Sequence, residues 1–152
     1  MPAPTFRPAT VEDVEFIVGL SASNHVGTLP ENSFPVGHSH FREAFAAIAA
    51  DPNQRLTVAE LDGRRVGTIQ ITFTPGLGLG GTWRATLESV HVVAEERSKG
   101  LGGAMVRWAI EQCRERGCYM VQLTSNKART DAHRFYNRLG FAQSHEGFKL
   151  YL

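Results

Sequence analysis

A glycine-rich segment between a strand-like and a helix-like stretch restricts the fold of this chain more than any other feature. The segment "EERSKGLGGAM" (95–105) carries three glycines in four consecutive positions, with "LESVHVV" (87–93) before it and "AMVRWAIEQCRER" (104–116) after it. Glycine weakens a helix, so glycines at a helix start indicate a requirement of the backbone itself. The first N–H groups of a helix lack partners and the dipole is positive there, so the unit predicts an anion-binding turn.

The remaining pattern predicts one domain over residues 1–152, of the α/β (α+β) class, with a mixed central sheet and about four helices. Asp62 and Gly63 separate two apolar-rich stretches and predict a hairpin. Residues 23–40 form a long irregular stretch, and loops of that length are often functional. In chain order the sequence predicts strands at 6–10, 55–61, 64–73, 83–93 and 119–125, helices at 11–20, 41–51, 104–116 and 130–140, and a hairpin at 141–152.

Composition and charge argue against several classes of protein. The chain has a formal net charge of +1, which lacks the excess of positive charge typical of a protein that binds nucleic acid. Its two cysteines, Cys113 and Cys118, cannot build a disulfide framework and fit reduced core thiols of a cytoplasmic protein. The start "MPAPTFRPAT" lacks the pattern of a signal peptide, and no apolar stretch is long enough to span a bilayer, so no membrane association is expected.

Three kinds of nucleotide-binding loop use a glycine-rich turn before a helix, and two of them do not fit. A P-loop needs a Lys-Ser or Lys-Thr pair after its glycines, whereas Lys99 precedes them. A dinucleotide fingerprint needs a third glycine where this chain has Met105. The third pattern, Arg/Gln-x-x-Gly-x-Gly/Ala, is matched from Arg97 to Gly102 and resembles the coenzyme A pyrophosphate loop of the GNAT superfamily of N-acyltransferases.

A second motif in the right order strengthens this resemblance. "DAHRFYNRLGF" (131–141) is similar to the second GNAT signature, A-x-x-x-Tyr-x-x-x-Gly-Phe, and "FRPATVEDV" (6–14) to the usual first strand and helix start. The resemblance implies a GNAT fold whose mixed sheet is splayed at the coenzyme A site. It also implies acetyl-CoA as co-substrate and direct attack by an amine in a ternary complex.

The resemblance carries several coenzyme contacts onto this chain. The Val92 N–H would polarise the thioester carbonyl, and Tyr136 would serve as general acid for the leaving thiolate. The family often has Asn seven residues before this tyrosine, whereas this chain has Arg129. The implied coenzyme-binding residues are Val92, Val93, Arg97, Ser98, Lys99, Gly100, Leu101, Gly102, Gly103, Ala104, Asn126, His133 and Tyr136. For the side chains of Arg97 and Lys99, exposure to solvent without a role is an equal alternative.

Glu88 is the candidate for the base that accepts the amine proton. It lies four residues before Val92, so regular alternation puts both on one face of the strand, with burial expected to raise the pKa of the carboxyl. A surface glutamate and a water relay are the alternatives. On the same reasoning His91 points to the opposite face and is expected to be a packed strand histidine.

The acceptor site is expected at residues 23–40, around Trp83, and at the terminal hairpin. The candidate contacts there are His25, Trp83, Arg84, Glu88 and His145. The C-terminal part is similar to the branch that contains aminoalkylphosphonate acetyltransferases, which implies an anionic amine held by Arg84 or Arg129. His38 and His40 form a His-x-His pair without a carboxylate at ligand spacing, so no metal is expected.

Three function classes follow, in order of preference. The first is an N-acetyltransferase for a small-molecule amine. The second acts on a protein lysine or N-terminus, and the third is a non-catalytic acyl-CoA-binding module. Because GNAT proteins often pair through terminal strands, the resemblance also implies a homodimer.

Overall fold

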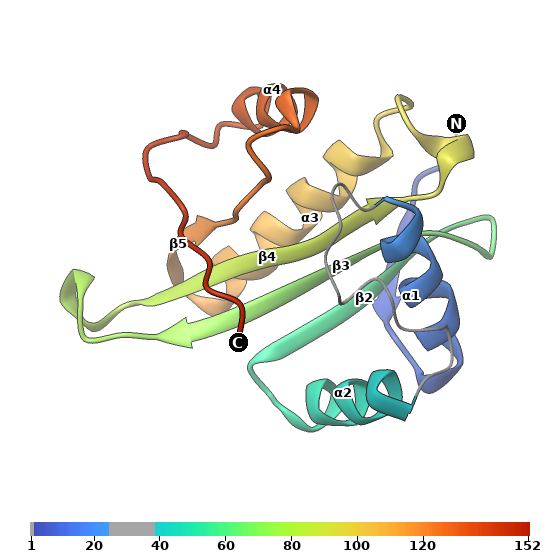
Figure 1. Cartoon of the computed structure of the whole chain (residues 1–152), viewed down its shortest axis with the longest axis horizontal. Coiled ribbons are helices and arrows are strands. Elements are labelled where there is room, and N and C mark those ends of the chain that lie inside the picture. The colour runs from blue at the N-terminus through green and yellow to red at the C-terminus, as the bar shows by residue number, and fades with distance from the viewer. Residues whose placement is uncertain (1, 25–38) are drawn as a thin grey trace.

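A computed structural model describes residues 2–24 and 39–152 and shows a five-stranded sheet flanked by helices (Figure 1). His25 and His38 lie outside the described residues. The strands are β1 (Thr5–Pro8), β2 (Gln54–Leu61), β3 (Arg64–Pro75), β4 (Trp83–Val92) and β5 (Cys118–Gln122). The α-helices are α1 (Val14–Ser23), α2 (Ser39–Ala50), α3 (Leu101–Arg116) and α4 (Thr130–Arg138), and short 3₁₀ turns cover Val11–Asp13, Leu79–Gly81 and Ala94–Glu96.

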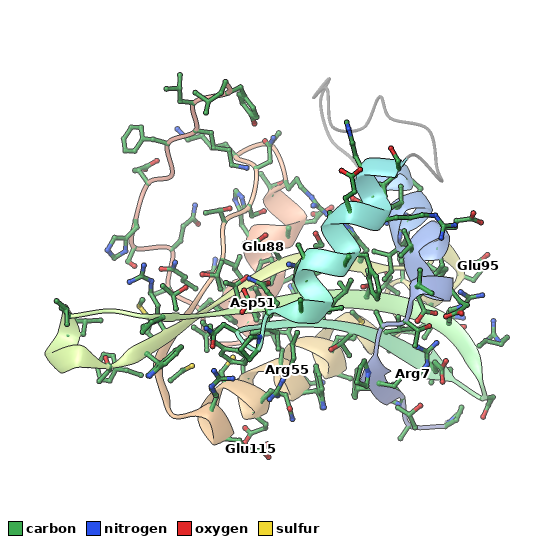
Figure 2. The ribbon with its side chains drawn as sticks, turned by 90° about the horizontal axis from the view of Figure 1, so that it is seen from below. Arg7, Asp51, Arg55, Glu88, Glu95 and Glu115 are labelled. Carbon is green, nitrogen blue, oxygen red and sulfur yellow. The ribbon has the colours of Figure 1, made fainter. Side chains whose placement is uncertain are left out.

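The strand order is β1-β2-β3-β4-β5, the same as the order in the chain. Successive pairs from β1 to β4 are antiparallel, and β4 and β5 are parallel. A parallel connection needs a crossover, and α3 supplies it. Figures 1 and 2 show α3 on one face of the sheet and α1 on the other. The predicted α/β class and mixed sheet are confirmed.

The β2–β3 hairpin forms where Asp62 and Gly63 predict it. Both residues have positive φ, +50° and +76°, which is the conformation of the two central residues of a type I′ turn. Leu61 pairs with Arg64 across this turn, so the loop is as short as a hairpin allows. The turn fixes the register between β2 and β3.

The core lies between α3 and the sheet. On α3, Met105, Val106, Ala109 and Cys113 are buried at helical spacing. They pack against a cluster of strand residues that includes Ile69, Ile71, Phe73, Ala85 and Leu87. Each fully buried Ile or Phe side chain contributes roughly 1.5–3 kcal/mol to stability. This packing holds α3, and with it the glycine segment, at the end of β4.

The structure corrects the prediction of a terminal hairpin. Residues 141–152 contain no strand, and Phe148, Leu150 and Leu152 are exposed. Their alternation is typical of a strand, but a strand exists only where an edge accepts its backbone, and this segment is not paired to any strand of the sheet. A smaller correction concerns α3, which begins at Leu101 and so takes Gly102 and Gly103 into its first turn.

Candidate active site

The sheet opens between β4 and β5 at the end nearest the glycine segment. The pairing of these two strands runs only from Trp83 and Cys118 to Thr86 and Gln122. β4 continues to Val92 and stays paired with β3. The outer edge of β4 beyond Thr86 therefore faces a gap instead of a neighbouring strand, which is the splay that the resemblance implied.

The backbone of Val92 presents an N–H group to this gap. The Val93 N–H donates to the Val66 carbonyl of β3 at 2.9 Å, and the Val93 carbonyl accepts from the Glu96 N–H at 3.0 Å. Successive N–H groups of a strand point to opposite edges, so the Val92 N–H points toward β5. Both backbone groups of Val93 already have partners, which leaves Val92 as the donor at the opening.

A cavity of about 520 Å³ lies beside the glycine segment. It is lined by Val92, Glu96, Arg97, Ser98, Gly100, Gly102, Gly103, Arg107, Phe135, Arg138 and Leu139. Six of these residues are among the coenzyme contacts expected from the sequence: Val92, Arg97, Ser98, Gly100, Gly102 and Gly103. A second cavity of about 520 Å³ beside β1 and α2 contains none of the predicted site residues.

The turn that leads into α3 has the geometry of an anion-binding loop. Ser98 and Gly100 have positive φ, +61° and +88°, so the chain folds back on itself just before the helix begins. The Ala104 N–H donates to the Gly100 carbonyl at 3.1 Å and starts the ladder of the helix. The N–H groups from Leu101 to Gly103 precede that ladder and lack helical partners. They can bind an anion at the positive end of the α3 dipole.

The side chains of this turn differ in their surroundings. Lys99 forms an ion pair with Glu96 at 3.5 Å, and Leu101 is buried in the core. Arg97 turns back over the strand: its guanidinium contacts the Asn24 side-chain oxygen, and its Nε lies 3.4 Å from the Val92 carbonyl. The Arg97 side chain therefore joins the end of α1 to the end of β4.

Two arginines in the cavity wall were not among the sequence predictions. Arg107 lies one turn after Gly103 in α3, and its guanidinium reaches within 3.2 Å of the position that a Cβ would take on Gly103. Arg107 could have been predicted from Gly103, because residues four apart in a helix lie on the same face. Arg138, at the end of α4, comes to the cavity only through the tertiary fold.

A bulge in β4 corrects the predicted orientation of Glu88 and His91. Glu88 pairs with Gln70 and His91 with Thr68, so β4 has one more residue than β3 between these two pairs. The extra residue falls at Ser89–Val90, where Ser89 has a φ of +51°. Since Thr68 and Gln70 share a face of β3, Glu88 and His91 share a face of β4.

Val92, in contrast, faces α3 together with Gly67, the residue opposite to it. Glu88 lies on the other side of the sheet (Figure 2). The expectation that Glu88 and Val92 share a face is therefore wrong, because the bulge shifts the alternation by one residue. Glu88 is also exposed and not buried.

Tyr136 lies half-buried on α4, where its ring packs edge-on against Phe135 and Phe141. Burial raises the pKa of its phenol, while the nearby Arg129 charge acts in the opposite direction. In the described part of the chain no group hydrogen-bonds its hydroxyl. The phenol therefore stays protonated at neutral pH and retains a proton to donate.

Asn126 and His133 lie together next to α4. His133 Nε2 is 2.9 Å from the Asn126 carbonyl oxygen, and the Asn126 side-chain oxygen accepts from the Ala128 N–H at 2.9 Å. These bonds fix the loop between β5 and α4. The Asn126 amide NH₂ is left for other partners.

Other residues predicted to contact the acceptor lie away from the opening of the sheet at Val92. Trp83 stacks under Arg116, and Arg84 lies roughly 25 Å along β4 from Val92, at about 3.3 Å per residue. His145 lies in the exposed tail, where its Nδ1 is 2.7 Å from the Ser144 hydroxyl. Within residues 2–24 and 39–152 no group of three or more His, Cys, Asp or Glu side chains could hold a metal ion, and no helix is long and apolar enough to cross a membrane.

Comparison with known proteins agrees with this geometry. The model of the acetyltransferase (GNAT) family matches residues 24–141, which is most of the chain. The chain belongs to the GNAT acetyltransferase family. It is therefore an acyltransferase, and the glycine turn of this GNAT protein lies within the stretch that the family model matches.

The individual relatives carry names that describe different activities. The chain is 32% identical to an aminoalkylphosphonate N-acetyltransferase of Salmonella typhimurium over 97% of this chain and 91% of that protein. It is 36% identical to a glucosamine 6-phosphate N-acetyltransferase of Trypanosoma brucei brucei over 55% of this chain and 54% of that protein. A structure from Bacillus halodurans C-125, named a transcriptional regulator, superposes with a TM-score of 0.88 at 42% identity, covering 99% and 100% of the two chains.

Proposed function

We propose that this GNAT protein transfers the acetyl group of acetyl-CoA to the amine of a small molecule that also carries an anionic group. The observation that carries the proposal is the coincidence of three features at one end of β4. They are the splay that frees the Val92 N–H, the glycine turn at the start of α3, and Tyr136 on α4. Both curated relatives named above act, by their names, on phosphorus-bearing amines.

The proposed chemistry assigns one task to each part of this site. The N–H groups of the glycine turn hold the coenzyme pyrophosphate, with Arg107 and Arg138 at the cavity wall to balance its charge. The amine attacks the thioester carbon, and the Val92 N–H stabilises the developing oxyanion. The C–S bond then breaks, and the Tyr136 phenol supplies a proton to the departing thiolate. Glu88 is exposed on the face of β4 opposite to Val92, so it accepts the proton of the amine through a water relay.

The decisive experiment follows thiol release from acetyl-CoA over a panel of amines. The panel compares aminoalkylphosphonates and amino-sugar phosphates with uncharged primary amines and a lysine peptide. Release with the anionic amines supports the proposal. Binding of acetyl-CoA without release for any amine would instead support a non-catalytic acyl-CoA module, a role compatible with the regulator name of the Bacillus halodurans structure.

Tyr136→Phe tests the acid role within the same assay. Removing the hydroxyl leaves the ring packing with Phe135 and Phe141 in place, so the fold is retained. We expect kcat to fall by about 10²–10³, the usual size of an acid–base contribution, with little change in the KM for acetyl-CoA. Unchanged turnover would remove Tyr136 from the mechanism. Tyr119→Phe, on an exposed tyrosine of β5, is the matched control.

A further inference from the structure

Helix α4, which carries Tyr136, buries none of its residues completely. Its aromatic side chains, Phe135 and Tyr136, are partly buried against the core. The ring of Phe135 lies 3.5 Å from the position that a Cβ would take on Gly102, at the start of α3. A short helix gains most of its stability from packing on its neighbours, so the position of α4 depends strongly on how it meets α3.

Three arginines line the cavity beside the glycine turn, each from a different segment. Arg97 follows β4, Arg107 lies in α3, and Arg138 is the last residue of α4. In the described part of the chain no ion pair joins any of them to an acidic residue. Glu96 also lines this cavity, but its carboxylate already pairs with two other cations, at 3.4 and 3.5 Å. The cavity therefore carries positive charge that the protein does not neutralise.

Arg107 and Arg138 bring like charges to this cavity from two helices, so their repulsion opposes contact between α3 and α4. Arg107 reaches back over the glycine turn, where its guanidinium lies 3.2–3.6 Å from the position that a Cβ would take on Gly103. The Gly103 N–H is one of the donors at the start of α3 that lack helical partners. An anion bound to these N–H groups lies within reach of Arg107, and Arg138 can donate to it from the α4 side.

We infer that the pyrophosphate of coenzyme A bridges Arg107 and Arg138, and that this bridge positions α4 so that Tyr136 can protonate the leaving thiolate. The inference rests on the proposed function. In the free protein the two guanidinium groups repel each other, whereas in the complex both donate charge-assisted hydrogen bonds to one anion. Arg138 lies two residues after Tyr136 and acts on the reaction through the helix, so it is a positioning residue.

Amide hydrogen exchange of residues 130–139 tests the bridge with the coenzyme alone, without any acceptor. Saturating coenzyme A should slow exchange in α4 about tenfold or more, and dephospho-coenzyme A, which keeps the pyrophosphate, should do the same. Pantetheine has the thiol arm but no phosphate, and it should leave exchange in α4 nearly unchanged. Slowing by coenzyme A but not by the dephospho form would assign the bridge to the ribose phosphate and overturn the inference. Absence of slowing with bound coenzyme A would overturn it as well.

Variants at either end of the bridge sharpen this test. Arg138→Gln and Arg107→Gln should each abolish the slowing in α4 at saturating coenzyme A, although only one of them lies on that helix. Arg138→Lys, which keeps the charge, should restore part of it. Arg134→Gln is the matched control, because this arginine of α4 pairs with Asp131 and does not line the cavity. In the free protein Arg138→Gln should leave exchange in α4 unchanged or slower, since it removes a repulsion, and faster exchange there would contradict the inference.

Kinetics separate positioning of Tyr136 from simple binding of phosphate. With acetyl-CoA, Arg138→Gln should lower kcat about tenfold in addition to raising KM, because a displaced α4 misplaces the general acid. With acetyl-pantetheine, which offers no anion to bridge, the variant and the wild type should agree within about twofold. A higher KM for acetyl-CoA with unchanged kcat would make Arg138 a phosphate contact only and would refute its positioning role.

The two proposals fail in different ways. Thiol release with an amine, but no response of α4 to coenzyme A, keeps the acetyltransferase and removes the bridge. Slowed exchange in α4 that depends on Arg107 and Arg138, but no thiol release with any amine, keeps the bridge and removes the acetyltransferase.

Discussion

Asp13 shows how one carboxylate joins three parts of the chain. It is only 2% exposed, and it accepts hydrogen bonds from Arg7 at 2.7 and 3.0 Å, from Arg65 at 3.3 Å and from the Thr10 N–H at 2.8 Å. The Arg7 hydrogen bonds are the main cause that lowers the pKa of Asp13 to about 2. Strand β1, strand β3 and the first helical turn are tied together at this residue.

Asp13→Asn should destabilise the protein by about 2 kcal/mol at pH 7. The variant leaves two guanidinium groups without their partner, a loss kept moderate because both arginines are partly exposed to solvent. Since folding lowers this pKa, the contribution is present above pH 4 and is lost as the pH falls toward 2. Urea denaturation at pH 7 and at pH 2.5 measures both effects.

The matched control for this prediction is Asp131→Asn. Its ion pair with Arg134 lies on the surface of α4, where the Asp131 side chain is 93% exposed. We expect a change within about 0.5 kcal/mol. If both variants lose the same stability, the Asp13 network is not the stabilising feature that its burial indicates.

At the scale of elements, Gly67 lets β3, β4 and α3 approach one another closely. A Cβ on this residue would lie 2.8 Å from the Met105 sulfur and 2.9 Å from the His91 carbonyl oxygen. The methionine can move, but the carbonyl belongs to the backbone of β4. This close approach occurs opposite Val92, in the part of β4 that extends beyond its pairing with β5.

Gly67→Ala should therefore destabilise the protein by about 1–3 kcal/mol, the usual cost of overpacking a core. Gly19→Ala is the opposite case: its Cβ would meet nothing within 4 Å, and it lies inside α1. That variant should be neutral or gain up to about 1 kcal/mol, because alanine favours the helix. Thermal unfolding of the two variants should shift in different directions, and an equal shift would contradict this account of Gly67.

At the scale of the whole molecule, the exposed C-terminal segment is a candidate surface for pairing with a second copy of the chain. Phe148, Leu150 and Leu152 alternate along it and are each more than four-fifths exposed, at 95%, 87% and 117%. Edge strand β5 has β4 on one side, and no other strand of the described sheet pairs with its second side. Unpaired edges and apolar alternation together are typical of strands that pair between chains.

We expect a homodimer in which residues 141–152 pair with a second copy. Light scattering after size-exclusion chromatography should give twice the mass of the chain at micromolar concentration. Phe148→Lys combined with Leu150→Lys should shift the protein to the monomer, whereas Leu77→Lys, on another exposed leucine, should not. A wild-type monomer would contradict the expectation.

Much of the molecule could be predicted from local signals in the sequence. The Asp62–Gly63 turn, the order of strands and helices, and the glycine turn at Gly100 depend on neighbouring residues and on backbone conformations that few residue types adopt. The two GNAT motifs then identified the family, because close backbone approach to an anion constrains residue types at fixed spacing.

The tertiary structure alone decided which side chains meet. The bulge at Ser89 reversed the predicted faces of His91 and Val92. The residue types around Ser89 do not indicate a bulge, so the sequence predicts regular alternation of side chains along this strand. Arg97, Arg107 and Arg138 line one cavity from the loop after β4, from α3 and from the end of α4, and only the packing of these segments brings them together. A sequence fixes the conformations that each short segment prefers, whereas neighbours across the sheet arise only when those segments bury a common core.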